Sequence, residues 1–154
     1  MAGAVSLTPI GHVRSPRREP VDDDWGDVEA VIELAAGFGP GSLRGLDAFS
    51  HVEVVYLFHR VAEDAVESGA RRPRGNPRWP EVGIFAQRGK DRPNRIGVST
   101  ATLIEVDGTR VRVRGLDAID GSPVLDLKPH MRQFGARGEV RQPAWADELM
   151  AGYF

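Results

Sequence analysis

Short apolar runs separated by glycine and proline are the feature that most limits how this chain can fold. Its 154 residues include 18 glycines and 11 prolines, which end regular elements and leave little room for helices. Several short strands joined by such turns are typical of an all-β barrel or sandwich. We predict strands over residues 9–15, 28–34, 51–59, 82–86, 96–106, 109–114 and 122–127.

Two of these runs show the strand pattern most clearly. Residues 51–59 (HVEVVYLFH) are rich in β-branched and aromatic side chains, which favour a central strand. Residues 28–34 (VEAVIEL) alternate apolar and acidic side chains, as a half-buried strand does. Asp107 and Gly108 form a strong hairpin turn signal before residues 109–114.

Little helix is expected between the strands. Residues 42–50 are predicted to form one helical turn and a loop, and residues 60–69 a short helix. Residues 71–80 contain three prolines and therefore predict an exposed basic loop rather than a regular element. Pro143 suits the first position of a C-terminal helix that runs through Met150.

Length and composition restrict the class of protein. The length predicts one domain over residues 1–154. The sequence has no cysteine, which excludes disulfides, thiol catalysis and cysteine metal sites and fits a reducing interior. The N-terminus lacks the plan of a signal peptide, and no apolar run approaches membrane length. We therefore expect a soluble, cytoplasmic protein without membrane contact.

Charge is distributed unevenly along the chain. The net charge of −2 argues against bulk electrostatic binding of nucleic acid. Residues 19–33 nevertheless carry seven acidic side chains, and residues 71–95 carry eight basic ones. Such a polarised surface could steer an anion such as RNA, or it could be a solvated surface with no partner.

Familiar catalytic motifs are missing from the sequence. There is no phosphate-binding loop, no Gly-x-Gly-x-x-Gly and no nucleophile elbow. The four histidines lack the spacing of metal ligands, so a hydrolase and a zinc enzyme are both disfavoured and no metal is expected.

Two unusual segments of the sequence are the strongest candidates for a ligand-binding site. Residues 88–99 (RGKDRPNRIGVS) form a cationic loop that returns to an apolar run. Residues 116–129 (LDAIDGSPVLDLKP) follow, with Asp117 and Asp120 beside a tight turn at Gly121. This pairing suits a ligand with anionic and cationic ends or hydroxyls. An internal arginine–aspartate network that holds the two loops is an equal alternative.

These segments resemble the TsaA-like, or TrmO, family of S-adenosylmethionine-dependent methyltransferases. The matching motifs are Phe-Ala-x-Arg at residues 85–88, Arg-Pro-Asn-x-Ile-Gly-x-Ser at 92–99 and Asp-x-x-Asp-Gly-Ser-Pro-x-Leu-Asp-x-Lys-Pro at 117–129. Residues 10–16 (IGHVRSP) and 45–51 (GLDAFSH) add further matches, so the likeness covers about residues 9–129.

The resemblance implies a small, mainly all-β barrel with short helices, a core over residues 9–129 and an extension over 130–154 that ends in a helix. It implies a homodimer that binds S-adenosyl-L-methionine near the subunit interface. The implied cofactor-binding residues are His59, Arg60, Arg88, Val98, Asp117, Ala118, Ile119 and Asp120, and we add Trp25 and Gly26 as candidates.

The implied activity is N6-methylation of threonylcarbamoyladenosine beside the tRNA anticodon. His59 is the one candidate for a catalytic base, because its imidazole titrates near neutral pH. Trp25 could stack on a base or on the cofactor's adenine, since the surrounding aspartates argue against full burial. The candidate substrate-binding residues are Arg72, Arg74, Arg92, Asn94 and Lys128, and Arg71 and Arg78 could add phosphate contacts.

Two departures from the family pattern concern the substrate more than the cofactor. Residues 22–26 (DDDWG) place acid where family members that modify tRNA carry a Pro-Arg-Gln-Gly-like segment, and residues 89–91 (GKD) also differ. Methyl transfer to a small molecule and a non-catalytic S-adenosylmethionine-binding module therefore remain alternatives.

Overall fold

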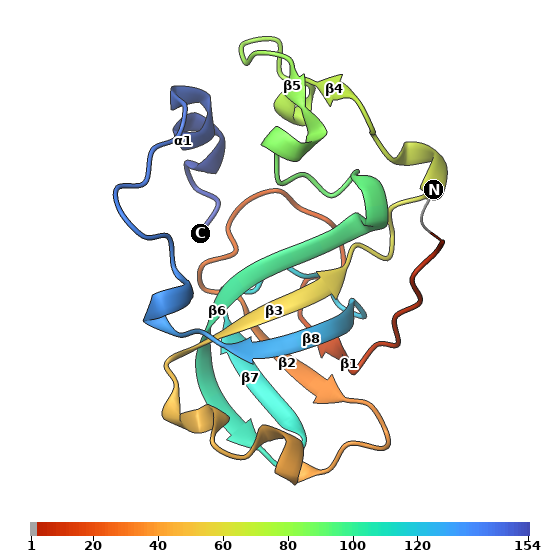
Figure 1. The fold of residues 1–154 in the computed structure, drawn as a ribbon, viewed down its shortest axis with the longest axis vertical. Helices are drawn as coiled ribbons and strands as arrows, with labels where there is room; N and C mark the ends of the chain where they lie inside the picture. Colours follow the sequence, from red (N-terminus) through yellow and green to blue (C-terminus); the bar gives the residue numbers. More distant parts are fainter. Residues whose placement is uncertain (1–2) are drawn as a thin grey trace.

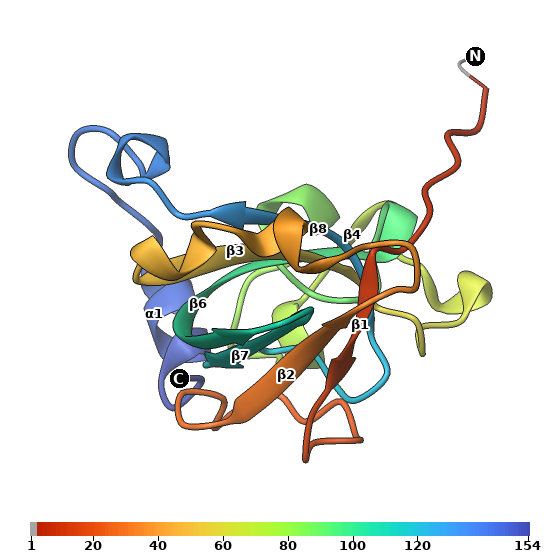
Figure 2. The same cartoon turned by 90° about the horizontal axis from the view of Figure 1, so that it is seen from below.

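A closed antiparallel barrel of six strands forms the centre of the protein. The computed structural model describes residues 3–154, so the first two residues of the predicted domain lie outside it. The strand order around the barrel is β1-β2-β7-β6-β3-β8, and the ring is visible in Figure 2. These strands are β1 (Gly11–Arg14), β2 (Glu29–Leu34), β3 (His51–Leu57), β6 (Ile96–Asp107), β7 (Arg110–Arg114) and β8 (Pro123–Pro129).

The remaining elements surround the barrel. A two-stranded hairpin of β4 (Ala70–Arg71) and β5 (Val82–Gly83) lies beyond one end of the barrel, as does α1 (Ala144–Met150) (Figure 1). Short 3₁₀ turns connect the strands; they span Pro40–Leu43, Leu46–Ala48, Glu63–Ala65, Pro73–Gly75, Ile84–Ala86, Pro93–Arg95 and Arg132–Phe134.

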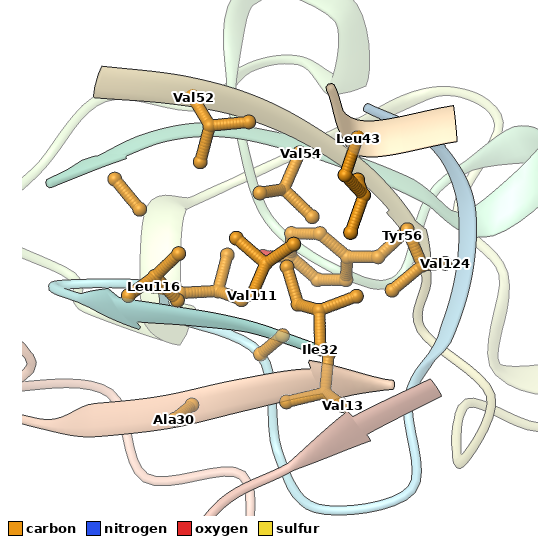
Figure 3. Packing of buried hydrophobic residues seen from close by; sticks show 13 residues of the cluster. Val13, Ala30, Ile32, Leu43, Val52, Val54, Tyr56, Val111, Leu116 and Val124 are labelled. Carbon is orange, nitrogen blue, oxygen red and sulfur yellow. The ribbon is translucent and has the colours of Figure 1, made fainter. Parts of the chain in front are cut away.

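The barrel interior is filled mainly by alternate side chains of β1, β2, β3 and β7. Val52, Val54 and Tyr56 alternate inward along β3, and each is at most 1% exposed. Ile32 on β2 and Val111 on β7 meet them from the opposite wall (Figure 3). β-branched side chains dominate this interior because they fit a pleated, enclosed surface.

The strand predictions are confirmed within a few residues at each end for all six barrel strands, and so is the mainly all-β barrel. The hairpin at Asp107 and Gly108 joins β6 to β7 as expected. The C-terminal helix begins one residue after Pro143.

Two local predictions were wrong. The strand predicted over residues 82–86 ends at Gly83, because Ile84–Ala86 turns to bury Ile84 while Phe85 stays 77% exposed. The side chain of Gln87 fixes this turn by donating to the carbonyl oxygens of Arg71 and Val82. The helix predicted over residues 60–69 shrinks to the 3₁₀ turn Glu63–Ala65.

Gly97 supplies a stability test of the barrel interior. A Cβ atom built on Gly97 would lie 2.5 Å from Cζ of Tyr56 and 2.9 Å from Cζ of Phe58. Gly97→Ala should therefore lower the free energy of unfolding by about 1–3 kcal/mol through overpacking, measured by urea denaturation. Gly83→Ala is the matched control, because nothing lies within 4 Å of its Cβ position; equal losses in both variants would contradict the explanation.

Candidate functional site

The carboxylate of Asp117 is the polar centre at one end of the barrel. Its Oδ1 accepts a hydrogen bond from the Tyr56 hydroxyl at 3.0 Å and a shorter one from the Ser99 hydroxyl. Its Oδ2 accepts a hydrogen bond from the hydroxyl of Tyr153. The Tyr56 hydroxyl also lies 3.1 Å from the backbone oxygen of Asp117. This one carboxylate therefore joins β3, β6 and the C-terminus.

The two phenols act as hydrogen-bond donors to Asp117. Burial raises the pKa of Tyr56 far above its ordinary value of 10.0, and the nearby charge of Asp117 raises it further. The pKa of Tyr153 is raised for the same reasons. Both hydroxyls therefore keep their protons across the physiological pH range.

The turn after Asp117 is bound to β1 and to the segment that follows it. Oδ1 of Asp120 accepts the Ser15 amide at 3.0 Å, and the amide of Asp120 donates to the carbonyl of Arg17 at 2.7 Å. The amide of Gly121 donates to the carbonyl of Val13 at 2.7 Å. Within residues 3–154, the amides of residues 117–119 donate to no backbone carbonyl. Asp117 and Ile119 are partly exposed whereas Ala118 is buried, so the turn can offer the amides of Asp117 and Ile119 to an acceptor on a ligand.

His59 lies against this turn from the end of β3. A Cβ atom on Gly121 would stand 3.7 Å from Nε2 of His59, and the Nδ1 atom of His59 is buried without a hydrogen-bond partner among the described residues. Burial lowers the pKa of His59, and the charge of Arg60 lowers it further. The imidazole is therefore neutral at neutral pH and can accept a proton or a hydrogen bond.

The arginines of the cationic loop at residues 88–99 donate hydrogen bonds to backbone carbonyls and not to Asp117 or Asp120. Arg88 donates to the carbonyl of Val98 at 2.6 Å, Arg92 to that of Gln87 at 2.7 Å and Arg95 to that of Val61 at 2.6 Å. In the described part of the chain, no ion pair joins this loop to the turn at residues 117–121. Of the two alternatives drawn from the sequence, the direct arginine–aspartate network between these two loops is therefore the one that the structure contradicts.

The loop is nevertheless close to Asp117. Arg88 lies near enough to Tyr153 to influence the pKa of its phenol, and Val98 directly precedes Ser99, which bonds Asp117. Two groups of the predicted cofactor residues therefore lie close together: Arg88 with Val98, and His59 with the turn that carries Asp117 and Asp120.

Trp25 differs most from its prediction. It is 3% exposed, so the expectation that it is not fully buried was wrong. The neighbouring carboxylates turn outward while the Arg17 guanidinium lies 4.5 Å from the centre of the indole. The backbone of Phe154 covers Gly26, where a Cβ atom would come within 2.6 Å of the Phe154 carbonyl carbon. Trp25 therefore presents no open face for stacking in this structure.

The predicted substrate residues are scattered or engaged elsewhere. Arg74 pairs with Asp23 at 2.9 Å, and the Arg72 guanidinium donates to the carbonyl of Trp79. Lys128 pairs with Asp126 at 2.9 Å on the barrel wall, opposite Glu53. Asn94 is exposed at a positive φ of 63°.

Other predicted residues also have local partners. Arg60, predicted to bind cofactor, donates to the carbonyl of Arg18 at 2.8 Å and pairs with Glu19 at 3.1 Å. Ala118 is buried at 1% exposure, and Ile119 accepts the Ser122 hydroxyl at its carbonyl.

Sequence reasoning missed three residues that hold Asp117. Ser99 closes the motif at residues 92–99 and could have been singled out there. Tyr56 sits inside an apolar strand, where nothing marks a hydroxyl that must find an acceptor. Tyr153 is next to the end of the sequence, and no local signal links it to Asp117.

The family model of the tRNA-methyltransferase O N-terminal domain matches residues 13–136. The chain belongs to this family. The resemblance noted from the motifs is thereby confirmed, and the match covers the whole barrel except the first residues of β1.

Named relatives of this TrmO-family chain include a probable S-adenosyl-L-methionine-binding protein of Pyrococcus abyssi, 36% identical over 144 residues. That match covers 89% of this chain and 74% of the relative. A tRNA (adenine(37)-N6)-methyltransferase of Escherichia coli is 37% identical over 134 residues, covering 79% of this chain and 56% of that enzyme.

Solved structures of the family have the same fold. The crystal structure of TrmO from Pseudomonas aeruginosa superimposes with a TM-score of 0.73 at 30% identity, covering 90% of this chain and 62% of that one. The chain therefore spans less than two thirds of both the solved protein and the Escherichia coli enzyme.

None of the helices in residues 3–154 has the length and apolar character needed to span a membrane. No group of three or more histidine, aspartate or glutamate side chains in this range is placed to hold a metal ion.

The lowered pKa of His59 predicts a pH-dependent stability. Because folding lowers this pKa from its ordinary value of 6.5, the unfolded chain binds the proton more readily. Stability should therefore fall as the pH drops below about 6.5 and be regained above it. Urea denaturation at about pH 7.5 and about pH 5.5 measures the difference.

The variant His59→Asn should reduce that difference, because it removes the titrating imidazole. An unchanged difference in His59→Asn would remove His59 as its source.

Proposed function

We propose that this chain is an S-adenosyl-L-methionine-dependent methyltransferase that acts on N6 of an adenosine in tRNA. The observation that supports this proposal is the set of contacts at the barrel end in a chain of the TrmO family. His59 lies against the turn at residues 117–121, and Arg88 bonds to Val98, next to the Ser99 that holds Asp117. The names of the relatives support both the cofactor and the acceptor class.

The chemistry of the donor set fits this cofactor. The unpartnered Nδ1 of His59 can accept or donate one hydrogen bond, and the unpaired amides of residues 117 and 119 can donate further ones. A guanidinium at Arg88 suits a carboxylate, and the carboxylate of Asp120 suits hydroxyl or amino groups. When bound, S-adenosylmethionine supplies a methyl group made electrophilic by its sulfonium.

The side chains of this protein orient the cofactor and the methyl acceptor, and they form no covalent bond with either. Arg88 and the turn at 117–121 orient the cofactor, and holding two reactants in line can contribute about 7–11 kcal/mol at best to a transfer reaction. The neutral imidazole of His59 is the group we assign to receive the proton that an adenine amino group loses, because it combines a low pKa with a place beside the turn.

The acidic residues 22–24 repel RNA less than their sequence suggested. Asp23 is paired with Arg74, so part of its charge is neutralised within the protein. Asp120 lines an open groove of about 420 Å³ together with Glu29, Arg14, Arg18 and Arg112. Arg14 pairs with Glu33, and Arg112 pairs with Glu29 and Glu105, so the charge of this groove is largely balanced and Arg18 is its candidate for a phosphate contact.

The acceptor we propose is N6-threonylcarbamoyladenosine in the anticodon loop. The purified chain should transfer labelled methyl groups to total tRNA from an Escherichia coli strain that lacks its own tRNA (adenine(37)-N6)-methyltransferase. The product nucleoside should be the N6-methylated form by mass spectrometry, and tRNA lacking the threonylcarbamoyl group should not react. If the protein binds the cofactor but transfers no methyl group to either tRNA, it is a binding module and not a methyltransferase. If it does not bind the cofactor, the proposal is wrong.

Asp120→Ala should weaken S-adenosylmethionine binding at least about tenfold, or about 1.4 kcal/mol, by calorimetry. The physical reason is the loss of a carboxylate that both faces the site and holds the Ser15 amide. Asp64→Ala, an exposed residue in the turn Glu63–Ala65, is the control and should bind normally. Unchanged affinity in Asp120→Ala would remove Asp120 from the site.

We further propose that the protein acts as a cytoplasmic homodimer, where tRNA is available. Phe85 and Val98 support a second copy at this end of the barrel, because they are 77% and 44% exposed and lie on either side of Arg88 in sequence. Light scattering should give twice the mass of one chain, and a monomer at all concentrations would contradict the dimer.

A further inference from the structure

The last residues of the chain are bound into the candidate site. The Asp24 amide donates to the carbonyl of Gly152 at 2.9 Å, and the Trp25 amide donates to the carbonyl of Tyr153 at 2.8 Å. These two bonds pair the C-terminus with the loop at residues 22–26 over two successive residues. Figure 1 shows the chain end returning from α1 toward the barrel.

The same segment is attached at a second point. Nε1 of Trp79 donates to the carboxylate of Glu148 at 2.7 Å, which ties α1 to the basic loop. That loop is in turn joined to residues 22–26 by the ion pair between Arg74 and Asp23. The C-terminal segment 144–154 and the two loops therefore support one another.

Tyr153 connects this assembly to the site itself. Its hydroxyl occupies Oδ2 of Asp117, while Tyr56 and Ser99 occupy Oδ1. Three hydroxyl donors on one carboxylate leave Asp117 little capacity for a ligand. They also hold the backbone of residues 117–119, whose amides are unpaired, in a single position.

We propose that Tyr153 is a positioning residue: its hydroxyl fixes Asp117, and through Asp117 the turn at residues 117–121 that contacts the cofactor. Asp117 thus supports the site rather than serving as a ligand. This inference rests on the proposed function, because it concerns the same cofactor. It assigns to the C-terminal segment a role in completing the site, and it supports treating the barrel and this segment as one domain.

The first test removes only the Tyr153 hydroxyl. Tyr153→Phe should weaken S-adenosylmethionine binding about tenfold by calorimetry, because it removes a charge-assisted hydrogen bond while keeping the ring. Glu148→Ala removes the other attachment of the same segment without touching Asp117, and should change the affinity less than about twofold. Equal losses in both variants would mean that the segment acts only through its packing, which would overturn the proposal.

The second test asks whether the effect passes through Asp117. In an Asp117→Ala background, Tyr153→Phe should have less than about a twofold further effect on binding. If that background does not fold, Ser99→Ala takes its place, and the combined loss should differ from the product of the two single losses. An independent tenfold effect in either background would overturn the proposal.

A third measurement needs no cofactor. The amides of Asp120 and Gly121, which donate to Arg17 and Val13, should exchange their hydrogens faster in Tyr153→Phe than in wild type or Glu148→Ala. Unchanged exchange would overturn the positioning role. If wild type shows no S-adenosylmethionine binding, the proposed function fails, and this exchange measurement still decides whether Tyr153 holds the turn.

Discussion

The hydrogen bonds to the carboxylate of Asp117 are the interaction on which the rest of the site depends. A tyrosine that fills the barrel interior must find an acceptor for its hydroxyl, because an unpaired buried hydroxyl is costly. Tyr56 finds it in Asp117, directly at the end of the barrel. The core of the fold and the polar site are thus joined by one side chain.

Asp117 in turn receives hydrogen bonds from parts of the chain that are far apart in sequence. Ser99 follows the cationic loop, and Tyr153 comes from the C-terminal segment. A charged acceptor strengthens each of these bonds relative to a neutral one. The segments of the site are therefore held together by their common hydrogen bonds to Asp117, and not by ion pairs between oppositely charged loops.

The arrangement of charge follows a related rule. The positive charges of Arg88, Arg92 and Arg95 repel one another within one loop. Each guanidinium group is held by a hydrogen bond to a backbone carbonyl oxygen. Acidic residues are used elsewhere, as Asp23 is for Arg74. Guanidinium groups with only carbonyl partners keep their net charge, which favours an anionic ligand at this end of the barrel.

Much of the fold could be predicted from local patterns. Alternation along residues 28–34 and the apolar run at 51–59 placed β2 and β3, and the turn at Asp107 and Gly108 placed the hairpin between β6 and β7. The motifs at residues 92–99 and 117–129 also indicated which two segments belong to the site. The burial of Trp25 could not be predicted, because it depends on Arg17 and on the distant chain end that covers Gly26.

The sequence by itself determined the strands, the turns and the family, since each is encoded in neighbouring residues whose spacing is fixed by the backbone. Only the tertiary structure decided which groups satisfy one another: Tyr153 with Asp117, Glu148 with Trp79, and backbone carbonyls with the arginines of the cationic loop at residues 88–99. The physical reason is that a hydrogen bond depends on a few tenths of an ångström between atoms. The packing of the basic loop and the C-terminal segment around one end of the barrel brings residues 36 or 69 positions apart to that distance.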